Sequence, residues 1–133
     1  MKTQFEIDMN TQEIIENNKL IAEFMGLKFK EDEQYVKELK EMRSEGIFFE
    51  QGHMLSELKY HTSWEWLMPV VERIEEMGFS TQVNTIGRQH QITKFEIFSG
   101  GADVLNRISK SKKEATYKAV VGFIQWYNQN KES

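Results

Sequence analysis

Apolar residues recur at helical spacing in three segments of this chain. In the clearest of them, 62–77, they fall at i, i+3, i+4, i+7 and i+10, at Trp64, Leu67, Met68, Val71 and Ile74. This spacing predicts one apolar face of an α-helix, which we expect to be core. Thr62 and Glu65 have the spacing of a capping box, and Gly78 suits a left-handed cap at the other end. Pro69 lacks a backbone donor, so we expect either a kink there or a regular helix that begins near it.

The same period predicts two further helices, at 11–25 and 112–128. The first ends at Gly26, which is followed by a leucine, and this pair is typical of a Schellman end. Ser111 and Glu114 have the spacing of a capping box at the start of the second. One face of that second helix is expected to carry Thr116, Ala119, Val120, Phe123 and Tyr127. We expect this last helix to close the core.

The segment between the second and third helices has a strand pattern. β-branched and aromatic residues on either side of a Gly-Arg pair predict an antiparallel hairpin at about 80–98, with strands at 80–86 and 89–98. Segment 99–110 is interpreted as a glycine-started connection that can include one helical turn near Leu105. The predicted fold is therefore α+β, a small antiparallel sheet packed with three helices.

Composition bounds the class of protein. A chain of 133 residues fits a single domain, residues 1–133, with its own core. It contains no cysteine, which excludes disulfides, cysteine zinc sites and thiol nucleophiles and agrees with a reducing compartment. The start carries charges where a signal peptide is apolar, and no apolar run approaches membrane-spanning length. We expect a soluble protein in the cytoplasm of the host cell, with no membrane contact and no cofactor.

The net charge of −4 is unevenly distributed, because residues 1–50 hold 12 acidic and 7 basic side chains. Within them, 31–50 forms a charged, helix-like insert with a narrow apolar stripe. Its acidic side chains, with two phenylalanines as an apolar anchor, are candidates to bind a protein partner: Glu31, Asp32, Glu33, Glu38, Glu41, Glu45, Phe48 and Phe49. The alternative is a solvated helix that shields Phe48 and Phe49 from water.

A second charged segment is basic. Its candidate nucleic-acid contacts are Arg107, Lys110, Lys112, Lys113 and Lys118. Cations at the start of a helix oppose the helix dipole and do not help the fold, which makes this segment a candidate to bind a ligand. A mildly acidic chain is otherwise a poor candidate for sequence-independent nucleic-acid binding, and the alternative is a connection kept soluble by its lysines.

Catalytic and metal-binding patterns are weak. The histidines at 53, 61 and 90 have no metal-ligand spacing, and neither an HExxH nor an EF-hand pattern occurs. We therefore expect no metal site, no catalytic residues and no enzymatic activity. An enzyme of the hydrolase or nuclease class, with a site built from His61, His90 and carboxylates, remains an alternative.

Three blocks of the chain resemble known sequences: NKLIAEFMG at 18–26, YHTSWEWLMPVVERIE at 60–75 and YKAVVGFIQWYN at 117–128. In them the chain resembles a family of small uncharacterised proteins of phages and prophages of Bacteroidota, and more distantly the phage sandwich domains in which helices and a hairpin pack as α/β layers. It departs from that family at 27–59. The resemblance implies a mobile-element origin and supplies no catalytic residues.

Proteins of mobile elements often bind a host or defence protein. The leading functional prediction is therefore a non-enzymatic inhibitor that binds such a partner, as an anti-CRISPR protein does when it acts on an RNA-guided nuclease with a basic channel. The acidic first half would be steered toward such a channel. The first alternative is a nucleic-acid-binding accessory module, with RNA as a possible ligand of the basic segment 107–118, and the second is the small enzyme.

Overall fold

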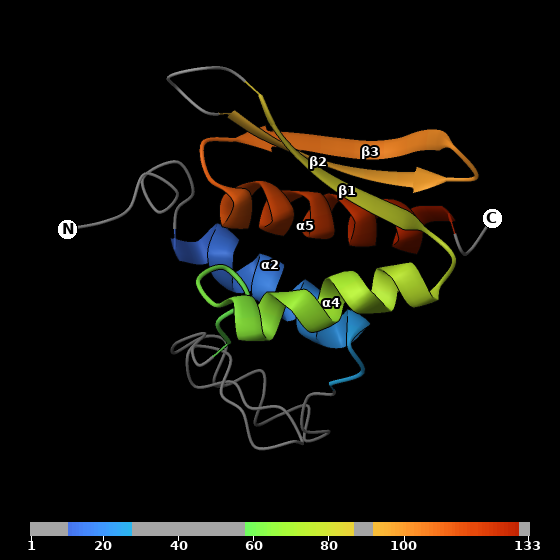
Figure 1. Ribbon diagram of the computed structural model, residues 1–133. Coiled ribbons are helices and arrows are strands. Elements are labelled where there is room, and N and C mark those ends of the chain that lie inside the picture. Colours follow the sequence, from blue (N-terminus) through green and yellow to red (C-terminus); the bar gives the residue numbers. More distant parts are fainter. Residues whose placement is uncertain (1–10, 28–57, 87–91, 131–133) are drawn as a thin grey trace, which may run out of the picture. The chain divides into compact units, whose positions relative to one another are not determined.

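The computed structural model describes residues 11–27, 58–86 and 92–130 (Figure 1). The chain divides into two compact units, residues 1–59 and residues 60–133. Helices and strands in the described residues are α2 (Thr11–Phe24), α4 (Trp64–Glu76), β1 (Ser80–Ile86), β2 (Ile92–Ser99), β3 (Ala102–Ser109) and α5 (Lys112–Asn130). These elements confirm the predicted α+β class. The predicted insert at 31–50 lies outside the described residues.

In the first unit, α2 ends as its sequence predicts. Gly26 has a φ of +92°, a conformation that glycine adopts without steric cost. Its N–H donates to the carbonyl of Glu23 at 3.0 Å, and the N–H of Leu27 donates to that of Ala22 at 2.9 Å. These two bonds form a Schellman motif, so the predicted end is confirmed. The buried amide of Asn18 donates to the carbonyl of Leu58 at 3.2 Å, which joins α2 to the end of this unit.

The second unit contains an antiparallel sheet with the strand order β1-β2-β3. The hairpin predicted at 80–98 is present as β1 and β2, whereas the interpretation of 99–110 as a connection is wrong. Residues 102–109 form β3, which pairs with β2 from Ser99 opposite Ala102 to Thr93 opposite Ser109. Gly100 and Gly101 have φ values of +58° and +87°, and two such residues make the tight turn that joins antiparallel strands.

Both helices of this unit lie on the same face of the sheet (Figure 1). Thr93, Phe95 and Ile97 of β2 are buried and alternate with the more exposed Lys94 and Glu96, so one side of β2 faces the core. Helix α5 contacts β2 and β3, while α4 contacts β1 and α5. We call the side of the sheet that carries the helices the inner face and the opposite side the outer face.

Helix α4 overturns the predicted N-terminal cap and one of the two alternatives for Pro69. Ser63 is its N-cap residue and makes no side-chain cap hydrogen bond, so the capping box of Thr62 and Glu65 is wrong. The helix starts at Trp64 and runs through Pro69, so it does not begin near the proline. Gly78 follows the helix with a φ of +100°, which confirms the predicted left-handed end.

The core stripe of α4 is rotated from the predicted one. Its buried residues are Leu67, Val70, Val71 and Ile74. Trp64 and Met68 were predicted to be core, but their side chains are 38% and 41% exposed. Val70 takes their place because the face that meets β1 and α5 is centred between Val70 and Val71.

Helix α5 supplies most of the core of the second unit. From Glu114 to Ile124 every residue except Lys118 is buried. Phe123 is fully buried, and its ring centroid lies 4.9 Å from that of Phe79, 5.7 Å from that of Trp126 and 6.0 Å from that of Tyr127. This aromatic cluster fixes the C-terminal half of α5 against the segment between α4 and β1. The prediction that α5 closes the core is confirmed for this unit.

Candidate nucleic-acid interface

The residues predicted to bind a protein partner, from Glu31 to Phe49, lie outside the described residues. That prediction is therefore untested. The basic segment 107–118 is described in full. It runs from the end of β3 through the connection at Lys110 and Ser111 into the first two turns of α5.

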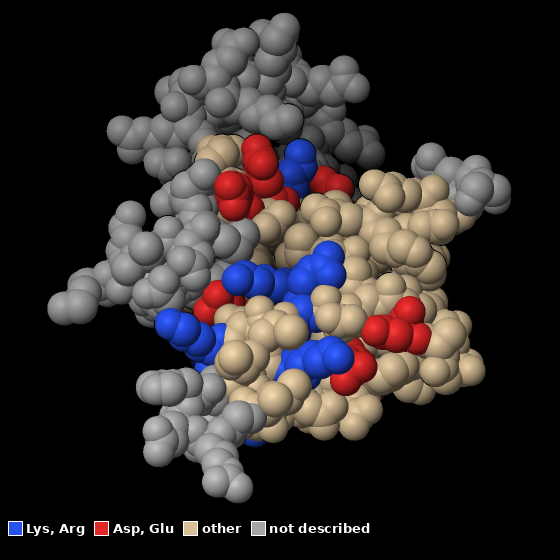
Figure 2. All heavy atoms as spheres, turned by 90° about the horizontal axis from the view of Figure 1, so that it is seen from above, with Lys and Arg blue, Asp and Glu red and all other residues tan. Residues whose placement is uncertain are grey.

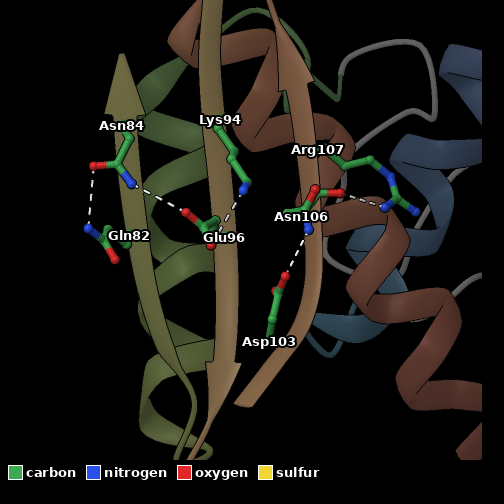
Figure 3. A network of polar contacts seen from close by, with 7 residues as sticks. All are labelled: Gln82, Asn84, Lys94, Glu96, Asp103, Asn106 and Arg107. Carbon is green, nitrogen blue, oxygen red and sulfur yellow. Dashed lines mark hydrogen bonds and ion pairs between the residues drawn. The ribbon is translucent and has the colours of Figure 1, made fainter. Parts of the chain in front are cut away.

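Arg107 packs against α5. It pairs with the inner-facing Phe95, and its Nη1 donates to the carbonyl of Asn106 at 2.7 Å (Figure 3). A Cβ atom on Gly122 would lie 2.9 Å from the Arg107 Nη2 atom and 3.1 Å from Leu105 Cδ1, so β3 and α5 approach closely here because residue 122 has no side chain. The guanidinium therefore contributes to the packing of the strand on the helix.

Lys118 has a carboxylate partner. Its Nζ atom lies 2.9 Å from Oε1 of Glu114, one turn earlier in α5, and the Glu114 side chain is buried. A glutamate four residues before a lysine is the favourable order on a helix. Of the five basic residues predicted to contact nucleic acid, Arg107, Lys118 and, through a hydrogen bond to the carbonyl of Thr62, Lys113 are therefore held by contacts within the fold.

Lys110, Lys112 and Lys113 gather at the first turn of α5, where the helix has its positive end. Ser111 caps this end, since its Oγ accepts a hydrogen bond from the N–H of Glu114 at 3.0 Å. This bond is the half of the predicted capping box in which the serine hydroxyl accepts from the N–H three residues later, and that half is confirmed. Lys113 Nζ donates to the carbonyl of Thr62 at 3.0 Å, which ties the start of α5 to the residues just before α4. No carboxylate of the described residues forms an ion pair with these three lysines.

We call Lys110, Lys112 and Lys113 the lysine cluster. It lies at the end of the sheet where β1 ends and β2 begins, because Ser109 pairs with Thr93 near the start of β2. Cations and backbone N–H groups at a helix start both attract anions. The arrangement thus provides positive charge at one end of the second unit.

Three exposed isoleucines accompany the cluster at this end of the sheet. Ile86 and Ile92 are directly opposed across β1 and β2, and Ile108 lies diagonally from Ile92 on β3. All three are on the outer face, because they share it with Lys94, which pairs with Ile108. Sequence reasoning did not single them out. The sequence pattern that could have pointed to them is the pair Ile86 and Ile92, on either side of the predicted hairpin turn.

The remainder of the outer face is polar and mixed in charge. Figure 2 looks onto this face and shows both basic and acidic side chains on it. The amide of Asn84 donates to Glu96 Oε1 at 3.3 Å, and Lys94 Nζ lies 3.9 Å from Glu96 Oε2 (Figure 3). On β3, the amide of Asn106 donates to the carboxylate of Asp103 at 2.9 Å. Because these carboxylates offset the cations beside them, the outer face is a weaker anion site than the lysine cluster.

No group of three or more histidine, aspartate or glutamate side chains suited to a metal ion occurs in the part of the chain that the structure describes. His61 lies edge-on to the buried ring of Tyr117, with 6.2 Å between the ring centroids. Burial raises the pKa of the Tyr117 phenol. His90 lies outside the described residues, so the predicted pairing of His61 and His90 in an enzyme site is untested.

Among the described residues no helix is long and apolar enough to span a membrane. Comparison of the chain with protein-family models, curated proteins and solved structures finds no match.

Proposed function

We propose that the chain is a nucleic-acid-binding protein that holds backbone phosphates at the start of α5. The observation that supports this proposal is the lysine cluster. Its three cations stand at the positive end of a helix, and no carboxylate of the described residues pairs with them. This placement opposes the helix dipole and costs folding stability, so a bound anion accounts for it better than the fold does.

Phosphates of a nucleic acid fit this site better than a small anion. Lys110 and Lys112 are exposed and lie on either side of the capping serine in the sequence. A polymer that presents successive phosphates can meet several such cations at once. The site offers contacts to the backbone, and these position a nucleic acid without reading its sequence. This function agrees with the predicted cytoplasmic location.

The salt dependence of binding tests the proposal. Contacts to three phosphates give a slope of about −2.7 in a plot of log affinity against log salt concentration, so a fourfold rise in salt lowers the affinity by about 40-fold. Fluorescence anisotropy with a short RNA duplex, a DNA duplex and a single strand measures this slope. A protein that binds none of these probes at low salt contradicts the proposal.

A matched pair of variants locates the contacts. Lys110→Gln with Lys112→Gln removes two charges from the lysine cluster, and Lys19→Gln with Lys59→Gln removes two from the first unit. The net charge of the two proteins is equal. We expect the first variant to reduce the magnitude of the salt slope by about 2 and the second to leave it unchanged. An equal loss of affinity in both variants would show that binding follows net charge and not this site.

The inhibitor prediction stays open beside this proposal. It depends on the acidic residues of 31–50, whereas nucleic-acid binding depends on the start of α5. Reversal of Glu38, Glu41 and Glu45 to lysine separates them. This variant is expected to retain the salt slope of the parent. If it instead loses a protein partner while its melting temperature is unchanged, the inhibitor role is supported.

A further inference from the structure

We infer that two copies of the chain associate through β1, which pairs antiparallel with β1 of a second copy. Strand β1 is an edge of the sheet, since within the described residues it pairs only with β2. An edge strand presents a row of backbone donors and acceptors that a further strand can use. The inference rests on this strand and is independent of the lysine cluster.

The two edges of the sheet differ in their protection. Strand β3 has a register shift opposite Ile97 and Phe98 and carries Asp103 and Arg107, and bulges and charges are common protections of an edge. Strand β1 has none of these features. Its seven residues, STQVNTI, include no charge, proline or glycine, and its pairing with β2 is regular from Ser80 to Ile86. Of the two edges, β1 is the one open to pairing.

The sequence of β1 complements itself. TQVNT reads as the same chemical series in both directions: a threonine, an amide side chain, a valine, an amide side chain and a threonine. In an antiparallel pair centred on Val83, Val83 faces Val83 of the second copy, Gln82 faces Asn84, and Thr81 faces Thr85. Threonine pairs across strands are stabilising, and no like charges face each other. This symmetric register is what a two-fold dimer requires.

The exposure of Val83 supports a second copy of the chain as the partner of the β1 edge. Its side chain shares the inner face with Phe95, which is buried, yet it is 42% exposed. Helix α5 contacts β2 and β3, and β1 is contacted by α4, which leaves Val83 partly exposed. Self-pairing places the two valines beside each other and removes apolar surface of both from water. A single strand pair is a small interface, so we expect an association in the micromolar range.

Light scattering after size exclusion tests the inference with the full chain across micromolar concentrations. The wild-type protein is expected to move from 15.8 kDa toward twice that mass as the concentration rises. Val83→Lys and Val83→Glu each place like charges opposite each other and should weaken the dimer by about tenfold or more. An equimolar mixture of the two variants pairs lysine with glutamate and should recover the dimer. This recovery also shows that both variants are folded.

Ile108→Lys provides the control, because it adds the same charge at an exposed isoleucine of the other edge strand. It should dimerise as the wild-type protein does. A wild-type protein that stays monomeric at every concentration overturns the inference. In that monomer, protection from hydrogen exchange of the β1 amides that do not donate to β2 would assign the edge to another segment of the same chain. Dimers of Val83→Lys as stable as the parent's would also refute it.

Discussion

Replacement of Phe123 by alanine should unfold the second unit at a much lower temperature than replacement of Trp64. Phe123 is fully buried, and its ring meets those of Phe79, Trp126 and Tyr127 at centroid distances of 4.9 to 6.0 Å. Truncation of a buried phenylalanine leaves a cavity and costs about 3–5 kcal/mol. At about 4 °C per kcal/mol for a chain of this length, the melting temperature should fall by roughly 12–20 °C.

Trp64→Ala is the comparison. Trp64 begins α4 and is 38% exposed, so its truncation should cost only about 1–2 kcal/mol. Thermal unfolding followed by far-ultraviolet circular dichroism measures both variants, and near-ultraviolet dichroism reports the aromatic cluster. Equal melting temperatures for the two variants would refute the assignment of Phe123 to the centre of the core.

Two smaller perturbations test local features. Ser111→Ala removes the hydroxyl that accepts a hydrogen bond from the N–H of Glu114. The loss of this cap should lower the free energy of unfolding, measured by chemical denaturation, by about 1 kcal/mol. A Ser111→Asp variant that is no more stable than Ser111→Ala would contradict the cap. Burial raises the pKa of Tyr60 from 10.0 to about 12, which spectrophotometric titration of the phenol measures. Because the folded-state pKa is the higher one, Tyr60 stabilises the fold fully below pH 10 and loses this contribution as pH rises toward 12. A Tyr60→Phe variant with the same stability loss over this window would assign the loss to other groups.

The helix ends and the first hairpin were predictable from local chemistry. Gly26 and Gly78 both adopt positive φ, and glycine is the residue that does so without strain. The strand at 80–86 was predicted with its observed bounds. These features depend on a few neighbouring residues, so a single sequence contains the information.

Strand β3 was missed because its bulge hides the alternation of a strand. Val104, Leu105 and Ile108 fall at i, i+1 and i+4, which resembles a turn of helix. In the structure the register shift lies between Asp103 and Leu105, and from Leu105 onward regular alternation places Leu105 on the inner face and Ile108 on the outer one. The stronger signal was Gly100-Gly101 between two apolar segments, which is typical of a hairpin turn.

The stripe of α4 shows a second limit of sequence patterns. Trp64, Leu67, Met68 and Val71 fit a helical face as well as Leu67, Val70, Val71 and Ile74 do. Only the positions of β1 and α5 decide between these two overlapping faces. Long-range packing likewise decides the roles of the basic residues, since the close approach of Arg107 to Gly122 joins residues far apart in the chain. The position of the lysines at the start of a helix was predicted, but which of them are engaged in the fold was not.

The most direct test of phosphate binding at the start of α5 is a titration of the ¹⁵N-labelled protein with a short RNA duplex, followed by amide chemical shifts. The lysine cluster and the capped first turn form the proposed contact. The account predicts that the largest shifts occur at residues 110–115, that they diminish as salt is added, and that the amides of Gln82, Asn84 and Asn106 on the outer face change little. Shifts centred on the outer face, or no shifts at low salt, would contradict it.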